Sequence, residues 1–71
     1  MKKKRLALVE ARKAINHSHE SIAKLLEISK SEYTHYENAN RTPSAKVIMK
    51  LESLFPKYKI TDLLQVTEVK E

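Results

Sequence analysis

The side chains that could take part in chemistry gather in the middle of this 71-residue chain. Of its three histidines, His17 and His19 are two residues apart, and His35 lies further along. Two histidines this close can bind zinc, but the chain has no cysteine and no carboxylate placed to complete a ligand set. We therefore expect no metal site and no small-molecule cofactor.

The sequence Ser21-Ile22-Ala23-Lys24 matches the S-x-x-K string of acylating hydrolases. A chain of this length has no room for the rest of that machinery, and packing accounts for Ile22 and Ala23. We expect no catalytic residues and no enzymatic activity.

The charge of the chain points to a polyanionic partner. The formal net charge is +5. In the first thirteen residues, Glu10 is the only acidic residue beside the basic residues Lys2–Arg5, Arg12 and Lys13. A basic end on a small domain is typical of a protein that binds a polyanion. The same charge can also serve solubility alone.

Length and composition predict one small helical domain over residues 1–71. The chain has no cysteine to form disulfides and no glycine, on which hairpin turns depend. The apolar run after Met1–Arg5 is too short for a signal peptide and is interrupted by Glu10 and Arg12. No stretch is long enough to span a membrane, so we expect a cytoplasmic protein.

Apolar periodicity predicts the first two helices. Leu8, Ala11 and Ile15 place a helix over residues 4–15, preceded by a basic arm over residues 1–4. Ser18 is a natural N-cap for a second helix that ends at Leu26. Its expected buried face carries Ile22, Leu25 and Leu26.

A capping box formed by Ser29 and Glu32 predicts that a third helix starts at residue 29. Tyr33 and Tyr36 share one face of it and should pack in the core. Stacking on single-stranded bases is the alternative role for these two rings.

Two more helices complete an expected all-α, five-helix fold. Ser44 should cap a fourth helix that ends before Pro56, and Thr61 should cap a short fifth. Residues 65–71 form a tail that the sequence leaves open as a helix end, a short edge strand or a frayed end.

The connection between the second and third helices is only Glu27–Ser29, and the third helix is polar on one side, as in a helix-turn-helix. The segment "SHESIAKLLEISKSEYTHYENANRTPS" resembles the Cro/C1-type (XRE-like) family of phage and bacterial repressors. The family pattern is roughly S-Q-E-E-L-A-x-x-L-G-I-S-x-x-x-I-S-x-x-E-N-G-x-R-x-P-S, and the similarity runs from about Leu6 to Leu64. This resemblance implies a lambda-repressor-like fold and a sequence-specific double-stranded-DNA-binding regulator, a repressor of phage or mobile-element type.

The resemblance also implies roles for individual residues. The helix over about residues 30–38 would lie in the major groove. The family's base-reading positions correspond to Lys30, Ser31, Thr34 and His35. Its phosphate contacts correspond to His19, Asn38 and Arg41, with Lys46 and Lys2–Arg5 added from charge alone. An ion pair that joins the first and third helices corresponds to Arg12 and Glu37.

Three residues depart from the family pattern. Glu27 stands where the family prefers glycine in a turn with positive φ, and a non-glycine residue there costs about 1–2 kcal/mol. Either this turn bends differently or the core absorbs the strain. Ala39 replaces another common glycine, and His17 takes a place that is usually aliphatic.

The expected partners are double-stranded DNA and a second copy of the chain. DNA specificity should require a homodimer on a palindromic operator. With no other segment available, the dimer surface should come from the C-terminal residues Phe55, Ile60, Leu63, Leu64, Val66 and Val69. The alternative function is a protein-interaction module, such as an antitoxin-like or accessory factor. It is favoured by Glu32, whose carboxylate would repel phosphate.

Overall fold

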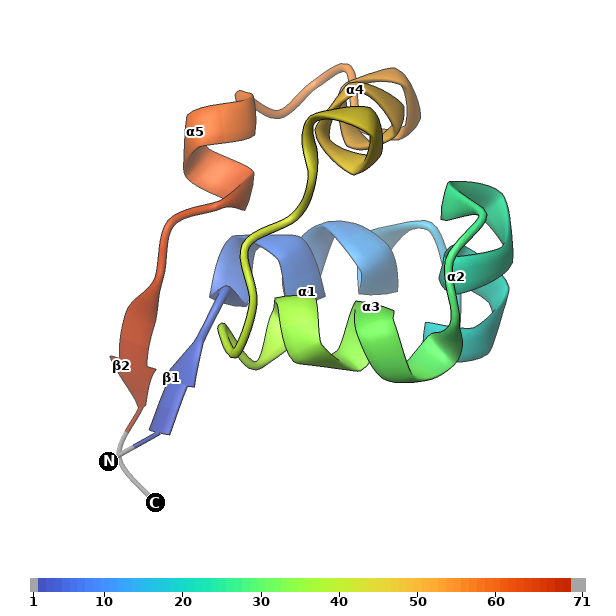
Figure 1. Ribbon diagram of the computed structural model, residues 1–71. Helices are drawn as coiled ribbons and strands as arrows, with labels where there is room; N and C mark the ends of the chain where they lie inside the picture. The colour runs from blue at the N-terminus through green and yellow to red at the C-terminus, as the bar shows by residue number, and fades with distance from the viewer. Residues whose placement is uncertain (1, 70–71) are drawn as a thin grey trace.

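The structure is a computed structural model that describes residues 2–69. Within that range five helices surround one core, and two short strands pair beside them (Figure 1). The elements are β1 (Lys2–Lys4), α1 (Leu6–Ala14), α2 (His19–Leu26), α3 (Lys30–Glu37), α4 (Ala45–Leu54), α5 (Ile60–Leu63) and β2 (Thr67–Val69). The predicted five-helix fold is confirmed. No helix within residues 2–69 is long and apolar enough to cross a membrane.

The two strands form an antiparallel sheet that joins the beginning and the end of the described chain (Figure 1). Lys2 is paired with Val69, Lys3 with Glu68 and Lys4 with Thr67. The opposite charges of Lys3 and Glu68 favour this register. Residues 2–4, which the sequence predicted as part of a basic arm, form a strand. Of the alternatives for the tail, the strand is the one formed.

The core takes apolar side chains from every helix, so the helices fix one another's positions. The predicted packing of Tyr33 and Tyr36 is confirmed, since their exposed fractions are 0% and 5%. The buried apolar residues are Leu8, Ala11, Ile22, Ala23, Leu26, Tyr33, Tyr36, Val47, Leu51, Phe55 and Leu63.

Some boundaries and faces differ from the sequence prediction. The first helix begins at Leu6 because Lys4 belongs to β1, and it ends at Ala14, which leaves Ile15 exposed. Leu25 is also exposed, because the inner face of α2 is already filled by its neighbours. Thr61 is not a cap, since α5 begins one residue earlier.

Serine caps start three of the helices, as predicted. The Oγ atoms of Ser18, Ser29 and Ser44 each accept a hydrogen bond from the backbone N–H three residues further on. Only half of the predicted capping box forms, however. The Glu32 carboxylate does not return to Ser29 but accepts a hydrogen bond from the hydroxyl of Tyr36.

The turn between α2 and α3 keeps the conformation that favours glycine. Glu27 has φ 60° and ψ 41°, in the left-handed region. The Ile28 N–H donates to the carbonyl of Ala23 across this turn, and Lys50 of α4 donates to both the Glu27 carboxylate and the Leu26 carbonyl. The hydrogen bond and charge of Lys50 lower the pKa of Glu27. Contacts with α4 thus offset the strain that the sequence predicted here.

Candidate nucleic-acid interface

The third helix has one side fixed in the protein and one side facing solvent. Tyr33, Tyr36 and Glu37 are buried against the rest of the domain. On the other side Lys30 and Ser31 are exposed, and Thr34 and His35 are half-buried. The structure thus brings the four predicted base-reading residues together on the accessible side of α3.

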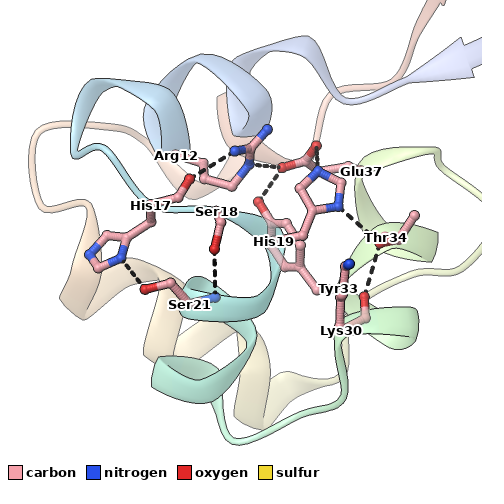
Figure 2. A network of polar contacts seen from close by, with 9 residues as sticks. All are labelled: Arg12, His17, Ser18, His19, Ser21, Lys30, Tyr33, Thr34 and Glu37. Atoms are coloured by element: carbon pink, nitrogen blue, oxygen red, sulfur yellow. Dashed lines mark hydrogen bonds and ion pairs between the residues drawn. The ribbon is translucent and has the colours of Figure 1, made fainter.

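A buried carboxylate holds this helix in place. The Nε atom of Arg12 donates to Oε2 of Glu37 at 2.6 Å, and the Tyr33 hydroxyl donates to the same oxygen (Figure 2). The Nε2 atom of His19 lies 3.1 Å from the other carboxylate oxygen. Since these residues come from α1, α2 and α3, Glu37 connects the three helices at one point.

The same network includes His19, which the sequence predicted as a phosphate contact. Its Nδ1 atom is 2.9 Å from the hydroxyl oxygen of Thr34, while its Nε2 atom faces Glu37 (Figure 2). Its ring also packs edge-on against Tyr33. Both ring nitrogens therefore have partners inside the protein, and a phosphate contact by His19 would have to replace one of them.

Burial and hydrogen bonding shift the pKa values of the network. Burial raises the pKa of Tyr33, and the hydrogen bond and charge of Glu37 raise it further. Burial alone would lower the pKa of Arg12, but its contacts with Glu37 outweigh burial and the net shift is upward. At neutral pH the guanidinium is therefore charged and the phenol neutral.

We expect alkaline conditions to unfold the protein through its two buried tyrosines. Burial raises the pKa of Tyr33 and, with the hydrogen bond to Glu32, raises that of Tyr36 to about 12. A phenol whose pKa is higher in the folded state contributes stability that is complete below its unfolded pKa of about 10. That stability is lost as the pH rises through the folded value.

The measurement is the free energy of unfolding in urea at a series of pH values from about 8 to 12. Stability should fall above pH of about 10, and Tyr33→Phe should make the fall shallower. An identical slope for the wild type and this variant would contradict the assignment to Tyr33.

Glu32, whose carboxylate the sequence could not place on a DNA-binding surface, has a partner within the protein. The hydroxyl of Tyr36 donates to Oε2 of Glu32 at 2.6 Å, one turn further along the same helix. Glu32 is half-buried in this contact, and the positive charge of Arg41 also acts on Tyr36. The carboxylate is thus used to pack α3 and does not stand alone on its accessible side.

The end of α3 continues the polar surface. The Nδ2 atom of Asn40 lies 3.3 Å from Nδ1 of His35, and an amide that donates to Nδ1 leaves the ring proton on Nε2. Asn38, the C-cap residue, is half-buried, and Arg41 is exposed. A surface depression beside this turn is lined by Lys2, Lys3, Lys4, Asn38, Ala39 and Asn40.

Lys46 lies apart from that group, exposed in the first turn of α4. It is close enough to Glu27 for its charge to lower the pKa of that carboxylate. The charge of Lys46 is at the surface, but it also interacts with the carboxylate of Glu27.

Arg5 is a central residue that the sequence did not reveal. It is 5% exposed, and its guanidinium donates to the carbonyls of Tyr36, Arg41 and Leu64 at 2.6, 2.8 and 3.1 Å. Its backbone N–H donates to the carbonyl of Glu37. No ion pair joins it to a carboxylate within residues 2–69. Burial lowers the pKa of Arg5.

The three carbonyls stabilise the positive charge of the Arg5 guanidinium. Those of Tyr36 and Leu64 lie at the C-terminal ends of α3 and α5, where the helix dipole is negative. Arg5 thereby joins the start of α1 to the ends of α3 and α5. By charge alone, the sequence groups Arg5 with the lysines Lys2–Lys4. The one feature of the sequence that indicated its buried role was its position directly before the first apolar run.

Within residues 2–69, no group of three or more histidine, aspartate or glutamate side chains is placed to hold a metal ion. The site is instead an accessible polar helix, preceded by a tight turn and a packed partner helix. That geometry defines the helix-turn-helix class of DNA-binding domains.

Comparison with protein families identifies the family within this class. Residues 8–67 match the family model described as "Helix-turn-helix". The chain belongs to the Cro/C1-type (XRE-family) helix-turn-helix proteins and is a DNA-binding transcriptional regulator of that type. No curated protein and no solved structure matches it.

Proposed function

We propose that the protein is a sequence-specific repressor that binds double-stranded DNA with α3 in the major groove. The observation that carries the proposal is the accessible side of α3, where Lys30, Ser31, Thr34 and His35 lie together on a helix held from behind by Glu37. A rigid helix with polar tips on one side is suited to reading base edges.

Two of these side chains have donors that suit purines. Lys30 is exposed at the start of α3 and can donate to O6 or N7 of guanine. When His35 accepts from Asn40 at Nδ1, its ring proton is on Nε2, which can donate to a purine N7.

Contacts with the DNA backbone would come from residues around the end of α3. Asn38 follows the helix directly, Arg41 comes three residues later, and Lys46 lies in the next helix. The lysines of β1 line the depression beside Asn38 and extend the positive surface in the same direction. Such contacts position the protein without reading sequence.

The dimer surface that we propose is smaller than the set of residues that the sequence suggested. Phe55 and Leu63 are buried in the core of the monomer, with exposed fractions of 3% and 0%, and are not available to a second copy. Val66 and Leu6 are exposed, and Leu64 is half-buried. We propose that a homodimer on a palindromic operator uses this smaller apolar group.

Selection of bound sequences from random duplex DNA tests the function directly. We expect an enriched consensus with two inverted half-sites, because a single α3 contacts too few bases for useful specificity. A consensus with one half-site would contradict the dimer alone. No enrichment of any sequence would contradict the function.

Two substitutions should separate base reading from backbone contact. His35→Ala should weaken binding to the selected site by about 1–3 kcal/mol and relax the preference at one base pair. Arg41→Ala should weaken binding to all sequences alike and reduce the salt slope by about one. The measurement is affinity for specific and random duplexes over a range of salt concentrations, with exposed Lys57→Ala as the control. Equal effects of both variants on both duplexes would contradict these roles.

A protein-interaction module remains the second candidate, and two exposed apolar side chains favour it. Met49 of α4 is 68% exposed and Leu25 of α2 is 47% exposed. Salt distinguishes the two functions, because binding to DNA weakens steeply as salt rises, whereas apolar contact with a protein does not.

A further inference from the structure

Among the four proposed base-reading residues, Thr34 is the one whose polar group is already used inside the protein. Its hydroxyl donates to the backbone carbonyl of Lys30, one turn earlier in α3, at 2.9 Å. The same oxygen lies 2.9 Å from Nδ1 of His19 in α2 (Figure 2).

A hydroxyl group has one hydrogen and two lone pairs. In Thr34 this single hydrogen is used inside the protein, because it goes either to the Lys30 carbonyl or, in the other tautomer of His19, to Nδ1 of that ring. No hydrogen is left for a base. Thr34 in this rotamer therefore cannot donate to N7 or O6 of guanine, to N7 of adenine or to O4 of thymine.

The two hydrogen bonds also decide which part of Thr34 is left without a partner. They turn the oxygen toward α2 and back along α3, and Thr34 is nevertheless only half-buried. The other heavy atom on Cβ is the methyl group, which is the part of the side chain without a hydrogen-bonded partner. Lys30, Ser31 and His35 carry no methyl group, so Thr34 is the apolar point on this side of the helix.

The major groove presents one apolar feature that identifies a base, the C5-methyl group of thymine. We propose that Thr34 determines specificity for thymine through contact of its methyl group with that C5-methyl group. This inference rests on the proposed function, because it requires α3 to lie in the major groove.

The rival role for Thr34 is polar. The remaining lone pair of its hydroxyl could accept from N4 of cytosine or N6 of adenine, or the side chain could leave both partners and rotate toward a base. Neither role depends on the methyl group of thymine, so removing that group from the DNA separates the rival from the proposal.

The test replaces each thymine of the selected site in turn by deoxyuridine, which differs from thymidine only by the missing methyl group. For the wild type, one replacement in each half-site should reduce affinity about fourfold, the loss expected for one buried methyl group. Thr34→Ser keeps the hydroxyl and removes the methyl, so it should bind the thymine and uracil sites equally. Thr34→Val keeps the methyl and removes the hydroxyl, so it should still prefer thymine.

Each outcome decides a different claim. If the wild type selects a site but no thymine in it is sensitive to the replacement, the role of Thr34 is overturned while the proposed function stands. The role is also overturned if Thr34→Ser keeps the preference at the same thymine. If the wild type selects no sequence, the proposed function fails and this inference fails with it. The comparison uses the ratio of affinities for two sites by one variant, so a general loss of affinity does not affect it.

Discussion

Replacing Glu37 by alanine should lower the free energy of unfolding by about 3–5 kcal/mol, the usual cost of removing one partner from a buried ion pair. The carboxylate accepts from Arg12 and Tyr33 and lies beside His19, and its own side chain is only 6% exposed. Without it, the guanidinium of Arg12 remains buried with no opposite charge. The loss is a large share of the roughly 4–10 kcal/mol expected for a domain of this size.

The measurement is urea unfolding followed by far-ultraviolet circular dichroism, with Glu52→Ala as the matched control. Glu52 is exposed on α4, so its removal should change stability by less than about 0.5 kcal/mol.

Because Glu37→Ala can leave part of the protein unfolded even without urea, a second variant is needed. The double replacement Arg12→Met with Glu37→Leu leaves neither charge of the pair buried and should recover much of the loss. Equal unfolding midpoints for Glu37→Ala and Glu52→Ala would contradict the role of Glu37.

Replacing Arg5 by methionine should lower the free energy of unfolding by about 3 kcal/mol. The apolar stem is kept, but the carbonyls of Tyr36, Arg41 and Leu64 lose their donor in a part of the protein with little access to water. Each unsatisfied buried acceptor costs about 1–3 kcal/mol, and local rearrangement should recover part of the sum.

A series at this position separates geometry from charge. Arg5→Lys keeps the charge, but an ammonium group donates from a single point and cannot reach three carbonyls as a planar guanidinium does, so about half the loss should remain. Lys13→Met removes a positive charge from the exposed side of α1 and is the control, with little expected change. A loss at Arg5→Met no greater than that at Lys13→Met would show that the three hydrogen bonds do not stabilise the fold.

Much of the helical framework could be predicted from the sequence, because its signals are local. Ser18, Ser29 and Ser44 predicted helix starts, since a cap depends on backbone groups only three residues away. The three-residue spacing of Tyr33 and Tyr36 assigned them to the core for the same reason. At Glu27 the sequence left two alternatives open, a turn that bends differently and a strained one, and the structure has the left-handed conformation.

The polar side chains of the site could not be predicted as well, because their partners lie far away in the sequence. Glu32 fits a capping box by spacing, yet it accepts from Tyr36, and this choice depends on how Tyr36 packs. His19 looked free for phosphate until α3 placed Thr34 and Glu37 beside its two nitrogens. Arg5 resembled one more residue of a basic arm because its three acceptors come from two distant parts of the chain.

The pairing of β1 with β2 has a consequence for how this domain can be joined to others. The two strands lie side by side (Figure 1), with Lys2 opposite Val69. The lysines of β1 line the depression beside the end of α3. The described chain therefore begins at Lys2 and ends at Val69 in the same place, next to the proposed DNA interface, and a fusion partner joined beyond either residue would leave from there. An internal attachment point suits such a fusion better. The polar connection over residues 57–59, between α4 and α5, is exposed and belongs to neither the sheet nor the accessible side of α3.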